Sequence, residues 1–294
     1  MKFRNIDLRE ISNILSIDYV GNNQTITGLN LSNRSSCFDS ILSYTVDSNF
    51  TKKALQNSKI KALFISKDCE KYISKNKCSY FIVDCPEESF YQLHKILVEK
   101  NYYKDKINNR IGLKCNIHSS VTIEDNVIIG DNVTISPNSV VKKNSVIESN
   151  VFIGDNSVIG SEGFEILFIK KKIPYYVPHV GGVFVKKNVF VGSNTTICKS
   201  LFEGYTIIGK NTKIDNQVHI AHNCDIGENC VIVPGVVLLG SVTVKDNVWL
   251  ASNSVVLNKV IVNENSVVGS LSFVTRDVKS NTTVFGNPAK VIKR

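Results

Sequence analysis

The chain has 294 residues, 43% of them hydrophobic, and a formal net charge of +9 at pH 7, so it is long enough for two domains with a sizeable core. It has no run of about 18 apolar residues and no signal-like N-terminus, so we expect no membrane span and no secretory leader. The lysines are dispersed and no nucleic-acid-binding motif occurs, so anionic small molecules or an acidic carrier protein are the expected partners rather than nucleic acid.

The eight cysteines are scattered and include no CxxC pair. In a chain of this length, that pattern favours free thiols in a reducing compartment. We therefore predict a cytoplasmic protein.

Residues 1–108 alternate between helical and strand-like patterns. The stretches "LREISNIL" and "SFYQLHKILVEK" have helical spacing, whereas "KALFIS" and "YFIVD" are typical of buried strands. The sequence thus predicts a small α/β domain at the N-terminus, whose role could be ligand binding or the capping of an oligomer.

Residues 109–276 repeat with a period of six. Aliphatic residues occupy every sixth position from 117 to 159, from 185 to 197, and from 208 to 274. The period is interrupted by an insertion at 161–184 and again at "CKSLFEGY". Residues 277–294 form a short C-terminal tail.

A six-residue period suits a short strand followed by a tight turn. Three repeats make one triangular coil of 18 residues, with the aliphatic side chains inside and coils about 4.8 Å apart. The Asn, Asp and Gly residues of the "GDN", "GEN" and "KDN" corners tolerate turn dihedrals. An antiparallel sandwich would instead show two-residue alternation. The predicted fold class is mainly β, a parallel β-helix preceded by the small α/β domain.

The repeat resembles that of the left-handed parallel β-helix acyltransferases, with the pattern [LIV]-[GAED]-x-x-[STAV]-x. This resemblance, rather than the spacing, implies left-handed coils, a known exception to the right-handed crossover rule. It also implies a homotrimer with active sites between subunits.

A closer resemblance joins three segments to the UDP-3-O-(3-hydroxyacyl)glucosamine N-acyltransferases of lipid A biosynthesis. The segments are "GSEGFEI", "IDNQVHIAHN" and "LSYTVDSNFTKKALQNSKIKALFIS". The last of these resembles a uridine-binding domain in which two rings grip the base, here Tyr44 and Phe50, while Asp47 takes the place of an Asn. Stacking on a base contributes about 1–3 kcal/mol. A buried aromatic pair would give the same pattern.

The same resemblance implies the catalytic residues. His222 would be the general base, in an outward and solvent-accessible position. Gly240 follows it by 18 residues, one coil, and its backbone N–H would hold the developing oxyanion. Asp215 and Asn216, together with His219, would line the acceptor pocket, although His219 could equally be a polar surface residue.

Two other classes of function remain open. A left-handed β-helix carbonic anhydrase binds zinc through three histidines, and the third ligand here would be His118, His179 or His94. We expect no metal, because His118 is about six coils from His222. The second class is a non-catalytic scaffold that binds nucleotide sugars.

Several positions depart from the lipid A enzymes. Cys198 and Lys199 replace an acidic residue and an arginine, and Lys259 replaces a second histidine. The long C-terminal helices are missing, and the ending "VFGNPAKVIKR" resembles that of coenzyme A-dependent sugar acetyltransferases. Phe273 aligns near the end of the acyl groove, where a ring would favour a short acyl group.

The sequence therefore predicts an N-acyltransferase without cofactor. Acyl-coenzyme A or acyl carrier protein would be the co-substrate, and the amine of a nucleotide-linked amino sugar would be the acceptor. The alternative within this class is a lipid A enzyme that uses a long 3-hydroxyacyl carrier protein.

Overall fold

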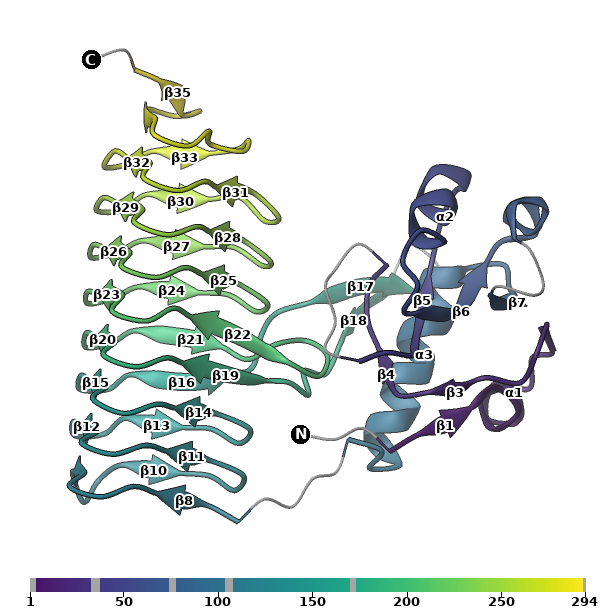
Figure 1. The fold of residues 1–294 in the computed structure, drawn as a ribbon, viewed down its shortest axis with the longest axis horizontal. Coiled ribbons are helices and arrows are strands. Elements are labelled where there is room, and N and C mark those ends of the chain that lie inside the picture. The colour runs from purple at the N-terminus through teal and green to yellow at the C-terminus, as the bar shows by residue number, and fades with distance from the viewer. Residues whose placement is uncertain (1–3, 33–37, 74–77, 104–107, 170–172, 293–294) are drawn as a thin grey trace. The chain divides into compact units, whose positions relative to one another are not determined.

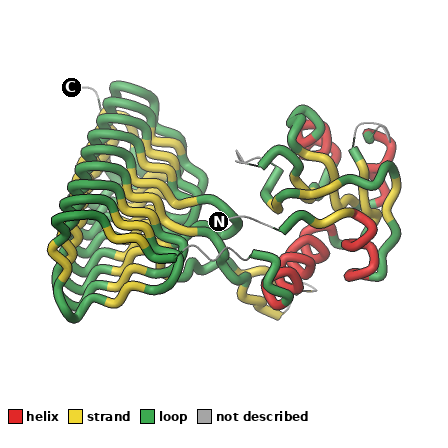
Figure 2. The backbone as a smooth tube through the Cα atoms, turned by 60° about the horizontal axis from the view of Figure 1, so that its bottom comes forward, coloured by secondary structure: helices red, strands yellow, loops and turns green. Residues whose placement is uncertain are grey.

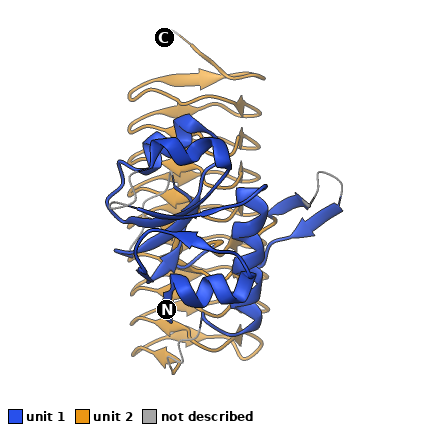
Figure 3. Cartoon of the chain, turned by 90° about the vertical axis from the view of Figure 1, so that its right-hand side faces the viewer, with its two compact units in different colours: residues 1–105, 165–178, 202–204 blue, residues 106–164, 179–201, 205–294 orange. Residues whose placement is uncertain are grey.

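The computed structural model describes residues 4–32, 38–73, 78–103, 108–169 and 173–292, which fall into two compact units (Figure 3). Unit 1 combines residues 1–105 with 165–178 and 202–204. Unit 2 consists of residues 106–164, 179–201 and 205–294. Two short segments of the repeat region thus group with the N-terminal residues, which the boundary predicted at 108 did not anticipate.

Unit 1 is an α/β unit with a sheet in the order β2-β7-β6-β5-β4 (Figure 1). Asp7 begins the first helix, where its side chain accepts the Glu10 backbone N–H at 2.8 Å, as an N-cap does. The elements of the unit are β1 (Ile6–Asp7), α1 (Leu8–Leu15), β2 (Tyr19–Val20), β3 (Thr25–Ile26), β4 (Gly28–Leu29), β5 (Ile41–Tyr44), α2 (Ser48–Ala54), β6 (Ile60–Ile65), the 3-10 helix η1 (Lys67–Tyr72), β7 (Ser79–Ile82), α3 (Pro86–Glu99), and a hairpin of β17 (Ile166–Ile169) and β18 (Ile173–Tyr176).

Unit 2 is a stack of coils whose short strands form three faces, and within each face the strands of successive coils pair in parallel (Figure 1). The β8 face contains β8 (Arg110–Ile111), β11 (Ile128–Ile129), β14 (Val146–Ile147), β19 (Gly182–Val185), β22 (Tyr205–Ile208), β25 (Asp225–Ile226), β28 (Thr243–Val244) and β31 (Ile261–Val262). The β9 face contains β9 (Asn116–Ile117), β12 (Thr134–Ile135), β15 (Phe152–Ile153), β20 (Phe190–Val191), β23 (Lys213–Ile214), β26 (Val231–Ile232), β29 (Trp249–Leu250), β32 (Val267–Val268), β34 (Thr283–Phe285) and β35 (Lys290–Val291). The β10 face contains β10 (Thr122–Ile123), β13 (Val140–Val141), β16 (Val158–Ser161), β21 (Thr196–Cys198), β24 (His219–Ile220), β27 (Val237–Leu238), β30 (Val255–Val256) and β33 (Phe273–Val274).

The six-residue period produces this stack directly, and Figure 2 shows the coils lying in register. In the repeats between the two ends of the stack the second strand residue points inward, as Ile220, Ile226 and Ile232 do at no more than 1% exposure. The repeat's Asn usually takes the left-handed conformation at the corner, for example Asn223 with φ of 61°. The backbone strain of that conformation is small for Asn. The predicted solenoid and its mainly β class are confirmed.

The coil does not stop at residue 276. Val278 bridges Val262, and β34 continues the β9 face in parallel with β32 before β35 turns back antiparallel to it. The tail predicted at 277–294 is therefore, over its described residues, the last layer of the sheet.

No helix among the described residues combines the length and apolar character required to cross a bilayer.

Candidate active site

His222 lies in the corner that joins the β10 face to the β8 face, two residues after the end of β24. Ile220, the last residue of β24, points into the core, and the residue after His222, Asn223, turns the chain with a positive φ. Both interruptions of the period, the insertion after β16 and the segment between β21 and β22, leave the coil at this same corner. Both segments inserted into the solenoid therefore begin at the corner that contains His222.

Hydrogen bonds to Asn223 set the tautomer of the His222 ring. The Leu201 backbone N–H donates to Oδ1 of Asn223 at 3.1 Å, and Nδ2 of Asn223 donates to Oγ of Ser200 at 2.6 Å. These contacts orient the amide so that its oxygen faces Nδ1 of His222, at 3.0 Å. Nδ1 must then carry the hydrogen and donate it, which leaves the lone pair on Nε2.

Gly240 stacks on His222 one coil later, as the period predicts. The Ser241 backbone N–H donates to the His222 carbonyl at 2.9 Å, which fixes the register of the two corners. A Cβ on Gly240 would lie only 2.8 Å from Nε2 of His222 and 2.9 Å from Cε1. Glycine is required here because any side chain would enter the space that the imidazole occupies.

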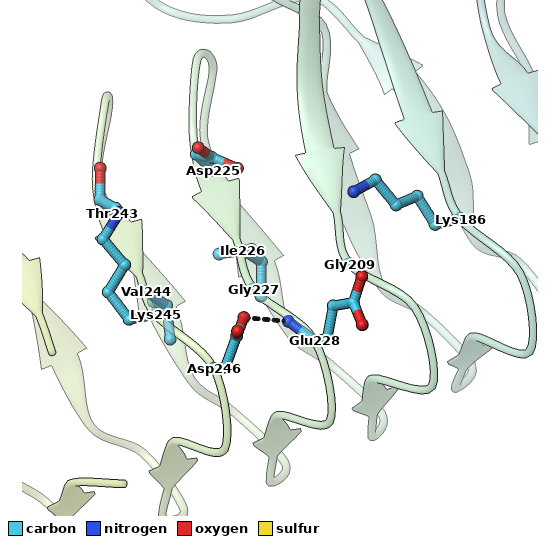
Figure 4. A pocket seen from close by; sticks show the side chains of 10 residues that line it. All are labelled: Lys186, Gly209, Asp225, Ile226, Gly227, Glu228, Thr243, Val244, Lys245 and Asp246. Atoms are coloured by element: carbon cyan, nitrogen blue, oxygen red, sulfur yellow. Dashed lines mark hydrogen bonds between the residues drawn. The ribbon is translucent and has the colours of Figure 1, made fainter. Parts of the chain in front are cut away.

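The backbone N–H of Gly240 donates no hydrogen bond to any other described residue. At some positions that are equivalent within the repeat a side chain accepts the N–H, whereas at others, Ser252 among them, the N–H likewise has no acceptor among the described residues. Ser149 accepts that of Asp131 at 3.1 Å, and Asp246 accepts that of Glu228 at 2.8 Å. Figure 4 shows the latter bond in a polar pocket on the β8 face, lined by side chains of both charges. At Gly240 the donor stays available, beside the nitrogen that can act as a base.

His222 is buried, contrary to the expected solvent-accessible position. The residue is 6% exposed. The ring of His179, which is 4% exposed, lies with its centroid 5.0 Å from that of His222 at an interplanar angle of 67°. His179 comes from the end of the insertion at 161–184, so the added chain covers an imidazole that a regular coil would expose.

Lys199 and Glu162 form an ion pair in the same unit. The Lys199 side chain is 2% exposed, and that of Glu162 is 54% exposed. Burial raises the pKa of the neighbouring Cys198 thiol to about 11, and the Glu162 charge contributes to this shift. Cys198 therefore stays a neutral thiol at pH 7, beside the ion pair of Lys199 with Glu162.

His219 heads a column of outward side chains on the β10 face. In the strand register, His219 is followed by Val237, Val255 and Phe273, one per coil. Phe273 points outward, since its side chain is partly exposed, whereas that of the next residue, Val274, is buried. Burial lowers the pKa of His219, and the charge of His222 lowers it further.

Asp215 and Asn216 occupy a different corner of the same coil, the one before β24. Oδ1 of Asp215 accepts the Asn216 N–H at 2.7 Å, and Oδ1 of Asn216 accepts the Ser193 N–H at 2.7 Å. Within the described chain these two residues therefore support the turn, and β24 separates them from His222.

The proposed base-binding residues all belong to unit 1. The Tyr44 hydroxyl donates to Glu87 at 2.9 Å, and its ring lies 5.2 Å from Phe90. Phe50 is 45% exposed, so its ring is accessible. Asp47 caps α2, where its Oδ1 accepts two backbone N–H groups at 2.8 and 2.9 Å. This capping explains Asp in place of Asn, since both residues serve as N-caps.

The histidines considered for a metal have other roles. Nε2 of His94 donates to the Pro178 carbonyl at 2.8 Å, so Nδ1 accepts from the Tyr103 hydroxyl at 2.7 Å, and burial lowers the pKa of His94 to about 4. His118 contacts Ser120 at 2.8 Å. His179 does lie beside His222, but no three metal-ligating side chains cluster within the described part of the chain.

Sequence reasoning missed the roles of His179 and Asn223. The motif "IAHN" includes Asn223, but only the structure shows which nitrogen of His222 it contacts. His179 lies outside the six-residue period, so the repeat could not predict which residue it packs against.

Comparison with known proteins identifies relatives of the whole chain. Residues 110–143 and 205–240 match the family described as "Bacterial transferase hexapeptide (six repeats)". The chain is 35% identical over 304 residues to the UDP-3-O-acylglucosamine N-acyltransferase of Campylobacter lari, covering 97% of this chain and 94% of the relative. An enzyme of the same name from Methylorubrum extorquens is 40% identical over 117 residues, which is 40% of this chain and 33% of the relative.

A solved structure supports the fold. The UDP-N-acetylglucosamine acyltransferase from Campylobacter jejuni aligns with a TM-score of 0.55 and 22% identity, over 63% of this chain and 70% of that one. At this identity the similarity shows the fold alone, the left-handed parallel β-helix of hexapeptide transferases.

Proposed function

Because the chain belongs to the UDP-3-O-acylglucosamine N-acyltransferase family of hexapeptide-repeat acyltransferases, we propose that it acylates the amine of a nucleotide-linked amino sugar. The acyl donor is a pantetheine thioester, either acyl-coenzyme A or acyl carrier protein. One observation carries the proposal: Nε2 of His222 adjoins Gly240, whose N–H has no acceptor among the described residues. A base and an oxyanion donor are the two groups that amide formation from a thioester requires.

The reaction follows from these two groups. The amine nitrogen attacks the thioester carbonyl carbon while its proton passes to Nε2 of His222. The carbonyl oxygen becomes negative and accepts the Gly240 N–H. The C–S bond then breaks, the thiolate takes the proton back from the imidazolium, and the products are an amide and a free thiol. Asn223 holds the tautomer throughout, because Nδ1–H remains bonded to its oxygen.

The column on the β10 face supports an acyl-binding groove. His219 and Phe273 are 54 residues apart, which is three coils, or roughly 14 Å at the strand spacing. Val237 and Val255 line the interval, and Phe273 stands at its end. The C-terminal segment lies against the same strand, since the Ala289 N–H donates to the Phe273 carbonyl at 2.8 Å. We infer that Phe273 limits the length of the acyl chain.

Phe273→Ala is expected to shift the donor preference toward longer acyl chains. Removal of the ring opens the end of the column, and each further buried methylene contributes about 0.8 kcal/mol, roughly a fourfold gain. Relative kcat/KM values for a series of acyl donors measure the effect. Phe285→Ala, which removes an exposed ring from the β9 face, is the control. An unchanged chain-length profile would remove Phe273 from this role.

Phe50→Ala and Tyr44→Ala are expected to weaken acceptor binding about 5- to 160-fold and to leave donor binding unchanged. The loss corresponds to about 1–3 kcal/mol of stacking on the base. Tyr44 packs against Phe90, so its removal also disturbs the unit, whereas Phe50 is exposed and tests the contact alone. Calorimetric titration with a uridine nucleotide provides the measurement. Unaltered affinity in Phe50→Ala would mean that these rings do not bind the base.

The assembly we propose is a homotrimer. Asp215 and Asn216 lie at a different corner of the coil from His222. They can therefore line the same site as His222 only if the site lies between two chains, with one corner contributed by each. The β9 face also presents apolar side chains outward, among them Phe190 at 40% and Trp249 at 47% exposure. We place the reaction in the cytoplasm, consistent with the scattered cysteines.

The acceptor we favour is a UDP-linked glucosamine derivative, because the name of the relative that matches 97% of the chain specifies UDP-3-O-acylglucosamine as its substrate. The donor is tested by incubating the protein with the acceptor and either acyl-coenzyme A or acyl carrier protein, with free thiol as the readout. Thiol release that depends on the acceptor supports transfer. Absence of release with every donor, alongside measurable acceptor binding, would favour a non-catalytic scaffold.

A further inference from the structure

The contact between His179 and His222 has no counterpart in the chemistry described so far. His179 immediately precedes the segment that leads into β19, and His222 follows β24, so the two residues approach from different coils. Their ring centroids are 5.0 Å apart, with the rings edge to face at 67°. A Cβ on Gly163 would collide with His179, so the glycine of "GSEGFEI" provides the space for this ring.

Three groups enclose the His222 imidazole. Asn223 binds Nδ1, the Gly240 backbone adjoins Nε2, and His179 packs on the ring itself. Such packing fixes the rotation of the ring, which the Asn223 bond alone leaves adjustable. A base held in this way keeps its lone pair directed toward the amine.

The charge of His179 is as important as its packing. When His222 accepts the proton of the amine, it becomes an imidazolium. If His179 were already protonated, two positive charges would lie about 5 Å apart in a buried site, which lowers the population of the second protonated form by roughly a hundredfold or more. A protonated His179 therefore prevents His222 from acting as a base.

Resting on the proposed function, we propose that His179 is a positioning residue of the acyltransferase site that must be uncharged for His222 to accept the proton of the amine. The two imidazoles then titrate as a coupled pair. His219 on β24 also interacts electrostatically with His222, and the ion pair of Lys199 with Glu162 belongs to the same unit. Glu162 pairs with Lys199, whereas the ring of His179 lies against that of His222 itself.

The pH dependence of kcat at saturating substrates tests the proposal. In the unaltered protein, a proton on either imidazole stops turnover and the coupling keeps the second proton off, so the acid limb of log kcat is expected to have a slope of one. In His179→Gln only His222 can take up the inactivating proton, so the acid limb is expected to move to lower pH, and the plateau kcat to fall about tenfold with little change in KM. His179→Phe restores a planar ring, so it is expected to recover part of the plateau while the acid limb stays at the lower pH.

The control is His118→Gln, which removes a histidine from another coil and is expected to leave the acid limb of kcat at the pH it has in the unaltered protein. An acid limb at the same pH in the unaltered protein and in both His179 variants would overturn the proposal. Thermal melting identifies any variant that fails to fold, and His179→Phe, of similar volume, then serves as the test.

A second readout is independent of acyl transfer. In an NMR titration, the His222 Cε1–H signal is expected to follow a two-step curve in the unaltered protein and a single step in His179→Phe. If transfer occurs but His222 titrates in the same single step in both proteins, the coupling is wrong while the proposed function holds. If the curves differ but no transfer is found, the imidazole pair is real and the proposed function fails.

Discussion

His222→Ala is expected to lower kcat for acyl transfer by about 10²–10⁴-fold, the usual effect of losing a general base. The variant retains the Gly240 N–H, so a residual rate from oxyanion binding and substrate positioning should persist. Because His222 is only 6% exposed, alanine also leaves a small void. A modest fall in melting temperature is therefore expected in addition to the kinetic loss.

The matched control for this variant is His118→Ala. It removes an imidazole from the same solenoid, at a position where the ring contacts Ser120. The control is expected to keep its activity. If His222→Ala retains more than half of the original kcat, another group removes the proton and the catalytic assignment is wrong.

Gly240→Ala is expected to reduce kcat about 10²–10³-fold, the effect of losing one oxyanion donor. The added Cβ would lie 2.8 Å from Nε2 of His222, closer than carbon and nitrogen can approach without a bond. Either the ring or the backbone must move, and both movements separate the base from the donor. Steady-state kinetics at saturating acceptor measure the loss.

Ser252→Ala is the control for the glycine variant. Ser252 holds the equivalent place in a repeat at another corner, just before the left-handed Asn253. Alanine there is expected to leave kcat unchanged. If Gly240→Ala has the kcat of the unaltered protein, the oxyanion must be bound elsewhere.

The six-residue period explains why so much of the solenoid could be predicted from sequence. Each coil pairs with the next at a spacing of 18 residues, so a position in the sequence is also a position in space. This regularity placed Gly240 against His222, and the structure agrees. The column that joins His219 to Phe273 follows from the same spacing but was recognised only in the strand register. Because these contacts are local to stacked coils, little long-range information was needed.

The parts outside the period could not be predicted in the same way. His179 belongs to an insertion, and the six-residue repeat does not specify where the residues of an insertion lie against the coils. For this reason the sequence suggested an exposed His222, whereas the ring is buried beneath His179. The hydrogen bond of Asn223 that sets the His222 tautomer and the capping of α2 by Asp47 also depend on side-chain geometry, which the amino-acid sequence does not specify.

The mass of the reaction product tests the central claim most directly. The protein is incubated with a 3-hydroxyacyl carrier protein and UDP-3-O-acylglucosamine, and the nucleotide sugar is analysed by mass spectrometry. We predict a product heavier by one acyl group, bound through an amide that resists mild base, and formed at least a hundredfold more slowly with His222→Ala. An acceptor of unchanged mass with this donor and with acyl-coenzyme A, from folded protein that binds the acceptor, would contradict the account.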